Sequence, residues 1–247
     1  MTSPEIKVLP TPTDVAREAA ERVVRIGEEA IALSGRFSLV LSGGSTPRML
    51  YEMLARGPYA ARLDWTKVEV FFADERCVPA DHPESNYRLA RETLLSHVPI
   101  PGDNVYRIRG EIEPESAAKE YGLILKEKFA DAVPDLILLG MGEDGHTASL
   151  FPGTEALNET KHRAVANYVE RSTTGQSWRV TMTAPFINRA RNVIMLVTGA
   201  SKATRVSEVL EGPRDPRRLP VQLIAPASGT LTWLLDAAAA DMRSADT

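Results

Sequence analysis

The fold class rests on one stretch, Phe37-Ser-Leu-Val-Leu-Ser-Gly-Gly-Ser-Thr-Pro47. Its first five residues form a short apolar run, as expected of a strand that is buried on both faces. Two glycines then permit a tight turn, and Pro47 suits the first turn of a helix. Ser45 or Thr46 could cap that helix. The stretch therefore indicates a strand, a turn and a helix in succession, the repeating unit of an α/β protein.

The same alternation of strand and helix continues along the chain. Further strands are expected at Val68–Phe72, Asp135–Leu139, Asn192–Val197 and Pro220–Ile224. Helices are expected at Asp14–Leu33, Pro47–Ala55, Ser85–Leu95, Pro114–Ala130 and Ser201–Glu211. Two less regular segments, His162–Val169 and Trp178–Met182, indicate shorter strands with antiparallel pairing. We expect a three-layer, doubly wound α/β domain with a mostly parallel sheet.

No feature of the sequence divides this domain. Neither a repeat nor a low-complexity stretch marks a boundary, so residues 1–247 are expected to form a single domain. Gly35 is expected to end the first helix. Gly212–Pro220 is typical of a surface loop, and the Ala-rich tail from Asp236 is expected to form a short helix.

Composition excludes several functional classes. The 247 residues include 29 Lys and Arg against 33 Asp and Glu, whereas a dedicated nucleic-acid binder should carry a basic excess. No apolar run approaches the ~20 residues that cross a bilayer, and the start lacks a secretory signal. Four histidines and the single Cys77 lie too far apart for a metal site. We expect a cytoplasmic protein without metal, cofactor, membrane or nucleic-acid partner, either a monomer or a weak homo-oligomer.

Three unusual loops follow the expected strands, and ligands of open α/β sheets bind at these carboxyl ends. In the first loop, backbone N–H groups and a helix N-terminus would converge on one point, which favours a phosphate. The residues concerned are Gly43, Gly44, Ser45 and Thr46. The loop is not a Walker A motif, because the Gly-Lys-Ser/Thr ending is missing. An ordinary glycine-rich turn remains the alternative.

The second loop contains three consecutive charged residues, Asp74, Glu75 and Arg76, shortly after the strand Val68–Phe72. The planar fork of an arginine matches phosphate or carboxylate oxygens. Asp74 could orient that fork or a substrate hydroxyl. A solvated charged turn would have the same sequence, but the position at a strand end favours a functional role.

The third loop, Gly140–Gly153, sets a histidine among glycines. Its first six residues match G-x-G-x-x-G, yet Pro152 interrupts the long helix that a dinucleotide site requires. His146 can accept a proton near neutral pH. Asp144 could fix the tautomer of that histidine or hold a substrate hydroxyl. A lone histidine is more often structural, but the neighbouring glycines and acid favour a catalytic role.

Two cations complete the candidate set. Lys202 begins an expected helix just after a strand, which suits an anionic ligand, although a solvated surface lysine is the alternative. Arg179 lies in the expected strand Trp178–Met182, and a substrate contact and a structural ion pair remain equally open. Cys77 has no histidine expected beside it and is interpreted as structural rather than nucleophilic.

Taken together, these motifs resemble the 6-phosphogluconolactonase family over nearly the whole chain. The shared motifs are Leu41–Pro47, Asp74–Pro79 with Ser85–Tyr87, and Gly140–Pro152. Lys202 and Arg179 also fall on positions of the family's pattern. The resemblance implies the α/β fold that is shared with glucosamine-6-phosphate deaminase and ribose-5-phosphate isomerase.

The resemblance also implies a reaction, the metal-free hydrolysis of 6-phospho-D-glucono-1,5-lactone to 6-phospho-D-gluconate in the oxidative pentose phosphate pathway. His146 is then the expected general base on the attacking water. Arg76 would stabilise either the oxyanion or the phosphate, and Gly43–Thr46 with Lys202 would hold the phosphate. The expected orienting residues are Asp74 and Asp144, acting on Arg76, His146 or sugar hydroxyls.

Two alternatives remain. Glucosamine-6-phosphate deaminases or isomerases share the fold. Their motifs resemble Asp-Glu-Tyr where this chain has Asp74–Arg76, and Asn-Glu-Pro where it has Ser149–Pro152. Both differences favour the lactonase. A non-catalytic sugar-phosphate sensor would follow a helix-turn-helix module, whereas one long expected helix fills the segment before Phe37. A pure sensor would also have no need of His146.

Overall fold

The computed structural model describes residues 3–170 and 176–241. Its main sheet has six strands in the order β1-β9-β8-β5-β2-β3, and every pairing within it is parallel. These strands are β1 (Glu5–Leu9), β2 (Phe37–Leu41), β3 (Val68–Phe72), β5 (Leu136–Gly140), β8 (Asn192–Val197) and β9 (Thr230–Asp236). A small antiparallel sheet consists of β4 (Asp74–Arg76), β7 (Trp178–Met182) and β6 (Ala164–Tyr168).

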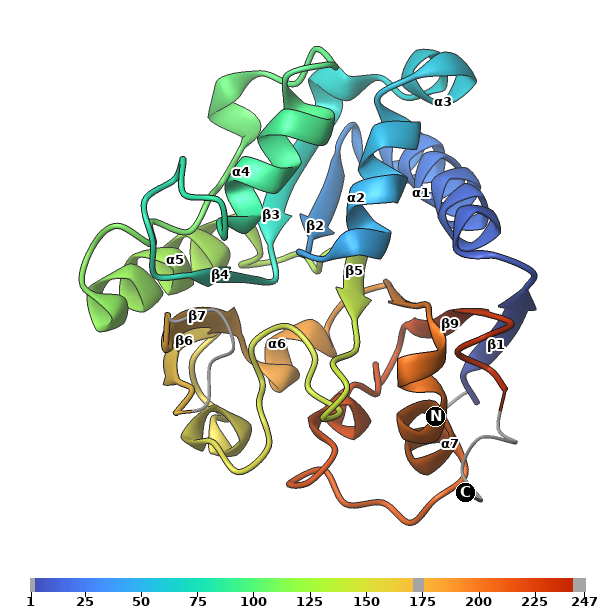
Figure 1. Cartoon of the computed structure of the whole chain (residues 1–247). Coiled ribbons are helices and arrows are strands. Elements are labelled where there is room, and N and C mark those ends of the chain that lie inside the picture. Colours follow the sequence, from blue (N-terminus) through green and yellow to red (C-terminus); the bar gives the residue numbers. More distant parts are fainter. Residues whose placement is uncertain (1–2, 171–175, 242–247) are drawn as a thin grey trace.

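Helices cover both sides of the main sheet, with α1 and α2 on one side and α6 and α7 on the other (Figure 1). The helices are α1 (Pro12–Ser34), α2 (Ser45–Leu54), α3 (Gly57–Arg62), α4 (Asn86–Ala90), α5 (Pro114–Lys128), α6 (Ala184–Ile187) and α7 (Ala203–Leu210). Helix α4 runs on into a π-helical turn at Arg91–Leu95. The three-layer, doubly wound α/β architecture with a parallel main sheet is therefore confirmed.

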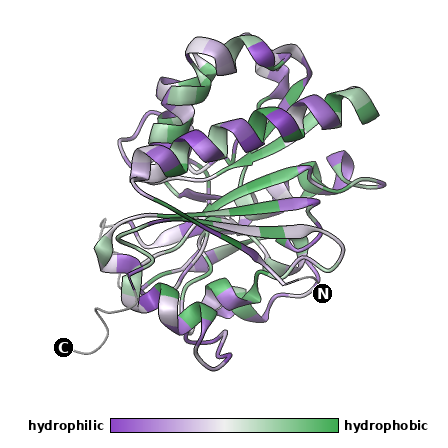
Figure 2. Cartoon of the chain, turned by 90° about the vertical axis from the view of Figure 1, so that its right-hand side faces the viewer, coloured by the Kyte–Doolittle hydropathy of each residue, from purple (hydrophilic) through white to green (hydrophobic). Residues whose placement is uncertain are grey.

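The core lies between the sheet and these helices. All five residues of β2 are buried, because helices cover both of its faces. Figure 2 shows the apolar strands enclosed by helices that are hydrophilic on their outer sides. Thr11 caps the start of helix α1, and its hydroxyl accepts a hydrogen bond from the N–H of Asp14. Gly35, with a φ of 76°, caps the end of the helix. The expected stop at Gly35 is confirmed.

Two expectations near the C-terminus are wrong. Pro220–Leu223 forms a 3-10 turn rather than a strand, and the strand that follows β8 in the sheet is β9, Thr230–Asp236. β9 occupies this position in the sheet and pairs along its length with both β1 and β8. Asp236 therefore ends a strand instead of starting a helix, and residues 237–240 form a turn. The rest of the expected tail helix, residues 242–247, lies outside the described residues.

The winding of the chain determines where a ligand can bind. The chain passes from β2 to β3 through α2, and it passes from β5 to β8 and β9 over the opposite side of the sheet. β2 and β5 are direct neighbours. The loops that follow these two strands therefore leave toward opposite faces, which opens a crevice at their carboxyl ends.

Candidate active site

Two adjoining cavities open at this crevice. A cavity of about 280 Å³ lies over the loop after β2, and one of about 1340 Å³ extends toward the small sheet. Both are lined by Asp74, Arg76, Gly142, His146, Ala148 and Lys202. Gly43, Gly44, Ser45 and Thr46 line the smaller cavity, while Asp144 and Arg179 line the larger one. The fold thus gathers the three predicted loops and both predicted cations around one space.

The N-terminus of α2 faces the smaller cavity without a side-chain cap. Gly44, with a φ of 115°, occupies the cap position, and Ser45 is already helical. The prediction that Ser45 or Thr46 caps this helix is therefore wrong. Thr46 instead shares a 2.7 Å hydrogen bond with the hydroxyl of Thr198, which follows β8. An uncapped helix N-terminus leaves N–H groups free to bind an anion.

Asp74 connects two of the loops. Its carboxylate accepts a 2.7 Å hydrogen bond from the hydroxyl of Ser149 and a 3.2 Å hydrogen bond from the amide of Asn86. Only 7% of Asp74 is exposed. Asn86 packs tightly against Gly43, where a Cβ atom would lie 2.0 Å from its Oδ1. Asp74 thereby fixes the third loop and, through Asn86, the glycine turn.

Glu75 organises the start of α4, a role that sequence reasoning missed. One of its carboxylate oxygens accepts hydrogen bonds from the N–H groups of Arg76 and Asn86, each at 2.8 Å. The other accepts from the hydroxyl of Ser85 and the N–H of Tyr87, each at 2.9 Å. Burial raises the pKa of Glu75, and these four donors oppose that shift. The only signal in the sequence was an acid between two other charged residues at a strand end.

Arg76 and Arg179 are cross-strand neighbours on β4 and β7. Arg76 donates a 2.6 Å hydrogen bond to the carbonyl of Glu84. Arg179, only 4% exposed, donates to the carbonyls of Gln176 and Trp178. Burial, followed by the positive charge of Arg76, lowers the pKa of Arg179. Two neighbouring guanidinium groups on the wall of a cavity favour an anionic ligand, which relieves their repulsion.

His146 and Asp144 form a directed pair. The imidazole Nδ1 lies 2.6 Å from Oδ1 of Asp144, which also accepts the backbone N–H of His146 at 3.1 Å. Burial raises the pKa of Asp144, but the hydrogen bonds and charge of His146 outweigh burial, and the net shift is downward. An ionised carboxylate only accepts hydrogen bonds, so in the neutral imidazole Nδ1 carries the proton and Nε2 keeps its lone pair. This is the tautomer that a general base needs.

Lys202 lies at the end of the 3-10 turn Ala200–Lys202, just before α7. Its ammonium nitrogen is 3.9 Å from a carboxylate oxygen of Glu143, a residue that is largely exposed. Lys202 lines both cavities, and the loop after β2 lines the smaller one with it. The lysine therefore lies at the site as predicted and not on an isolated surface.

Cys77 follows β4 and is partly buried. Burial raises the pKa of its thiol to about 11, so it stays protonated at neutral pH and is a poor nucleophile. Among residues 3–170 and 176–241, no group of three or more His, Cys, Asp and Glu side chains is placed to hold a metal ion. The crevice thus offers a histidine, carboxylates, cations and backbone N–H groups, together with hydroxyl and amide side chains.

Known proteins with similar sequences and structures point to one family. A profile of the family described as glucosamine-6-phosphate isomerases/6-phosphogluconolactonase matches residues 10–233. The 6-phosphogluconolactonases of Synechocystis sp. and Nostoc sp. are 42% and 40% identical, and each alignment covers 95% of this chain and 96% of the relative. The solved 6-phosphogluconolactonase of Trypanosoma brucei has a TM-score of 0.84 at 31% identity, covering 97% of this chain and 98% of its own. A monomeric glucosamine-6-phosphate deaminase, 22% identical with a TM-score of 0.84, shares the fold.

Proposed function

The chain belongs to the glucosamine-6-phosphate isomerase/6-phosphogluconolactonase family, and we propose that it hydrolyses 6-phospho-D-glucono-1,5-lactone to 6-phospho-D-gluconate, a step of the oxidative pentose phosphate pathway. One observation carries the mechanism: the His146–Asp144 pair, with its 2.6 Å contact, lies beside an uncapped helix N-terminus and three cations. This combination supplies a base, an anion cradle and electrostatic stabilisation around two adjoining cavities of one crevice.

His146 acts on water. Its Nε2 accepts a proton from a water molecule as the water oxygen forms a bond to the lactone carbonyl carbon. The carbonyl oxygen becomes an oxyanion, and Arg76, which lines both cavities with His146, is the candidate to stabilise it. When the tetrahedral intermediate collapses, the bond from that carbon to the ring oxygen breaks. The ring oxygen leaves as a hydroxyl and takes its proton from the imidazolium of His146, which restores the base.

The phosphate is held away from this carbon. The N–H groups of Gly43–Thr46 at the start of α2, together with Lys202, bind its oxygens. Phosphate displaces Glu143 as the partner of Lys202, since a dianion attracts the ammonium more strongly than an exposed carboxylate does. Arg179 lines the larger cavity beside its cross-strand neighbour Arg76, where it reinforces the positive field.

The test compares two lactones. A pH-stat records acid release from freshly prepared 6-phosphogluconolactone and from unphosphorylated gluconolactone, with spontaneous opening subtracted. Two charge-assisted contacts at about 1.5–3 kcal/mol each predict a preference in kcat/KM of roughly 10²–10⁴ for the phosphorylated lactone. Equal rates for the two lactones would contradict the phosphate cradle. Ammonia release from glucosamine 6-phosphate would contradict the reaction itself.

The proposal extends to the location of the enzyme, its cofactor use and its oligomeric state. No helix within residues 3–170 and 176–241 is long and apolar enough to cross a membrane. We propose a cytoplasmic enzyme that works without a cofactor, as one domain over residues 1–247 and as a monomer or weak homo-oligomer. A rice relative that is 39% identical is described as chloroplastic, so cell fractionation is the measurement that decides the location. Light scattering of the purified protein decides the oligomeric state.

A further inference from the structure

We propose that Phe151 is a positioning residue for the imidazole of His146, a role that rests on the proposed lactonase function. The two rings are stacked, with centroids 4.1 Å apart and planes inclined by 25°. Both residues line the larger cavity. Phe151 belongs to the third loop, but its type alone gave no reason to assign it to the site.

The stack supplies a restraint that the hydrogen bond to Asp144 cannot. That bond fixes Nδ1 of His146 at one point, and 29% of the histidine side chain is exposed. A ring held at one nitrogen can still swing about the hydrogen bond, which would carry Nε2 away from the water it must deprotonate. A flat apolar surface against one face of the imidazole removes this freedom. Nε2 then stays within hydrogen-bond reach of the reacting water.

Phe151 is itself held firmly by its backbone neighbours. Its carbonyl accepts hydrogen bonds from the N–H and the hydroxyl of Thr154, the latter at 2.8 Å. The amide of Asn167 on β6, which is 3% exposed, donates to the carbonyl of Ser149 at 2.8 Å and to the hydroxyl of Thr154 at 3.1 Å. A single buried side chain thus clamps the loop on both flanks of Phe151. The backbone that carries the Phe151 ring is therefore held on both sides of the residue.

The placement of Phe151 predicts a separation of kinetic constants. Phe151 belongs to the wall of the larger cavity, whereas Gly43–Thr46 belong to that of the smaller one. Loss of the aromatic ring should therefore lower kcat and leave KM nearly unchanged. A misplacement of a catalytic group by about 1 Å can cost 10²-fold, so we expect Phe151→Leu to lower kcat by roughly 10- to 100-fold. Phe151→Tyr keeps the ring and should restore most of the rate.

A second readout does not depend on turnover. The ring current of Phe151 shifts the imidazole proton resonances of His146 upfield, and these resonances are assigned by their loss in His146→Gln. Phe151→Leu should move them downfield, and Phe151→Tyr should leave them in place. Phe151→Met keeps the apolar volume without a ring and replaces the leucine variant if that protein does not fold. Tyr59→Leu, on the remote helix α3, is the matched control and should change neither kcat nor the resonances.

Each outcome decides the proposal. It is supported if the variants without an aromatic ring lose kcat at constant KM, if Phe151→Tyr regains it, and if the His146 resonances shift accordingly. Unchanged kcat, a loss confined to KM, or unmoved resonances in Phe151→Leu or Phe151→Met would overturn it. If the wild-type protein hydrolyses no lactone, the proposed function fails, and resonances that do not move would separately show that the stack is absent.

Discussion

At the scale of the residue, the charge and geometry of one carboxylate decide which imidazole nitrogen is the base. Asp144 can only accept from Nδ1 of His146, 2.6 Å away. In Asp144→Asn the amide can donate to Nδ1, which moves the ring proton to Nε2 and removes the base. We expect kcat to fall by roughly 10²–10⁴-fold, the contribution of a positioned base, when turnover is measured at pH 7. Asp103→Asn, at an exposed turn, is the control. Wild-type turnover in Asp144→Asn would show that tautomer selection is unimportant.

Gly142 tests how closely the backbone must approach the imidazole. A Cβ atom at this position would lie 2.1 Å from Nδ1 of His146 and 2.6 Å from Oδ1 of Asp144. Gly142→Ala must therefore push the pair apart, and we expect kcat to fall by about 10²-fold or more, because the base leaves its position. Steady-state kinetics measures the loss, and circular dichroism checks the fold. Gly102→Ala, where nothing lies within 4 Å, should retain wild-type kcat.

At the scale of the element, two glycines in helices should respond to alanine with opposite signs. A Cβ atom added at Gly122 in α5 would meet nothing within 4 Å, whereas at Gly27 in α1 that atom would lie 2.6 Å from Leu63. Gly122→Ala should raise the free energy of unfolding by about 0.5–1 kcal/mol, because alanine loses less backbone entropy in a helix. Gly27→Ala should lower it through overpacking. Urea unfolding measures both, and equal signs would contradict this account.

The elements also show what the sequence could predict. β2, β3 and β8 lie at their expected residues, because short runs that are apolar on both faces are typical of strands buried in a parallel sheet. β1 was missed because Glu5 and Lys7 make it a half-polar edge strand. The apolar run at Pro220–Ile224 resembles a strand equally well, and only long-range pairing gives the place in the sheet to β9 instead. Local pattern cannot decide between two such segments.

At the scale of the whole molecule, the topology explains why the candidate site could be predicted in part. The loops after β2, β3 and β5 were recognisable, because the carboxyl ends of parallel strands share one edge. The adjacency of Arg76 and Arg179 could not be recognised from the sequence, because it depends on the antiparallel pairing of β4 with β7. The contacts of Glu75 and of Phe151 likewise depend on how loops fold back. Sequence therefore indicated the reacting groups, and packing revealed the residues that hold them.

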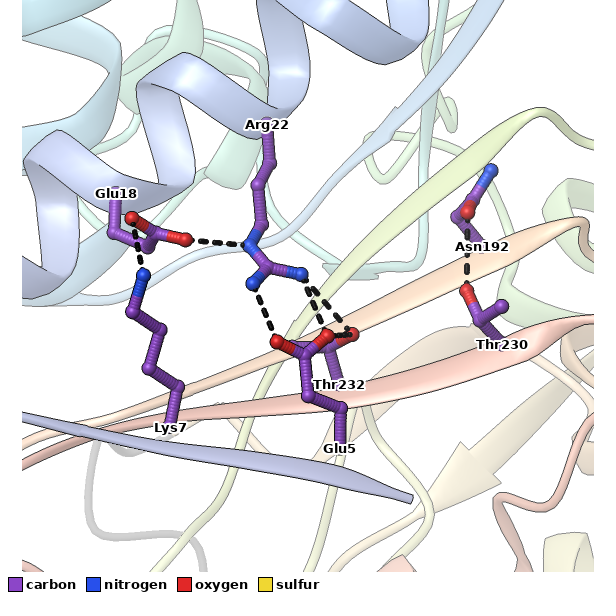
Figure 3. Close-up of polar contacts among 7 residues, drawn as sticks. All are labelled: Glu5, Lys7, Glu18, Arg22, Asn192, Thr230 and Thr232. Carbon is purple, nitrogen blue, oxygen red and sulfur yellow. Dashed lines mark hydrogen bonds and ion pairs between the residues drawn. The ribbon is translucent and has the colours of Figure 1, made fainter. Parts of the chain in front are cut away.

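The opposite end of the sheet is stabilised by charge. The side chain of Arg22 on α1 is 17% exposed and forms two ion pairs, with Glu5 on β1 at 2.6 Å and with Glu18 at 2.8 Å (Figure 3). Lys7 on β1 pairs with Glu18 at 2.9 Å. The hydrogen bond from Arg22 lowers the pKa of Glu5. Burial raises the pKa of Glu18, but Lys7 and Arg22 outweigh it and the net shift is downward. The network ties the edge strand to the longest helix.

These shifts fix the sign of a pH dependence. A carboxylate whose pKa is lower in the folded protein than its ordinary value of 4.5 stabilises the fold above that pH and loses the effect as pH falls through the folded pKa. Arg22→Met should therefore cost roughly 1–2 kcal/mol in urea unfolding at pH 7, and the gap to wild type should narrow at pH 3. Arg25→Met removes an exposed pair with Glu29 on the same helix and should cost under about 0.5 kcal/mol. A gap for Arg22→Met that stays constant with pH would contradict stabilisation by charge pairing with Glu5 and Glu18.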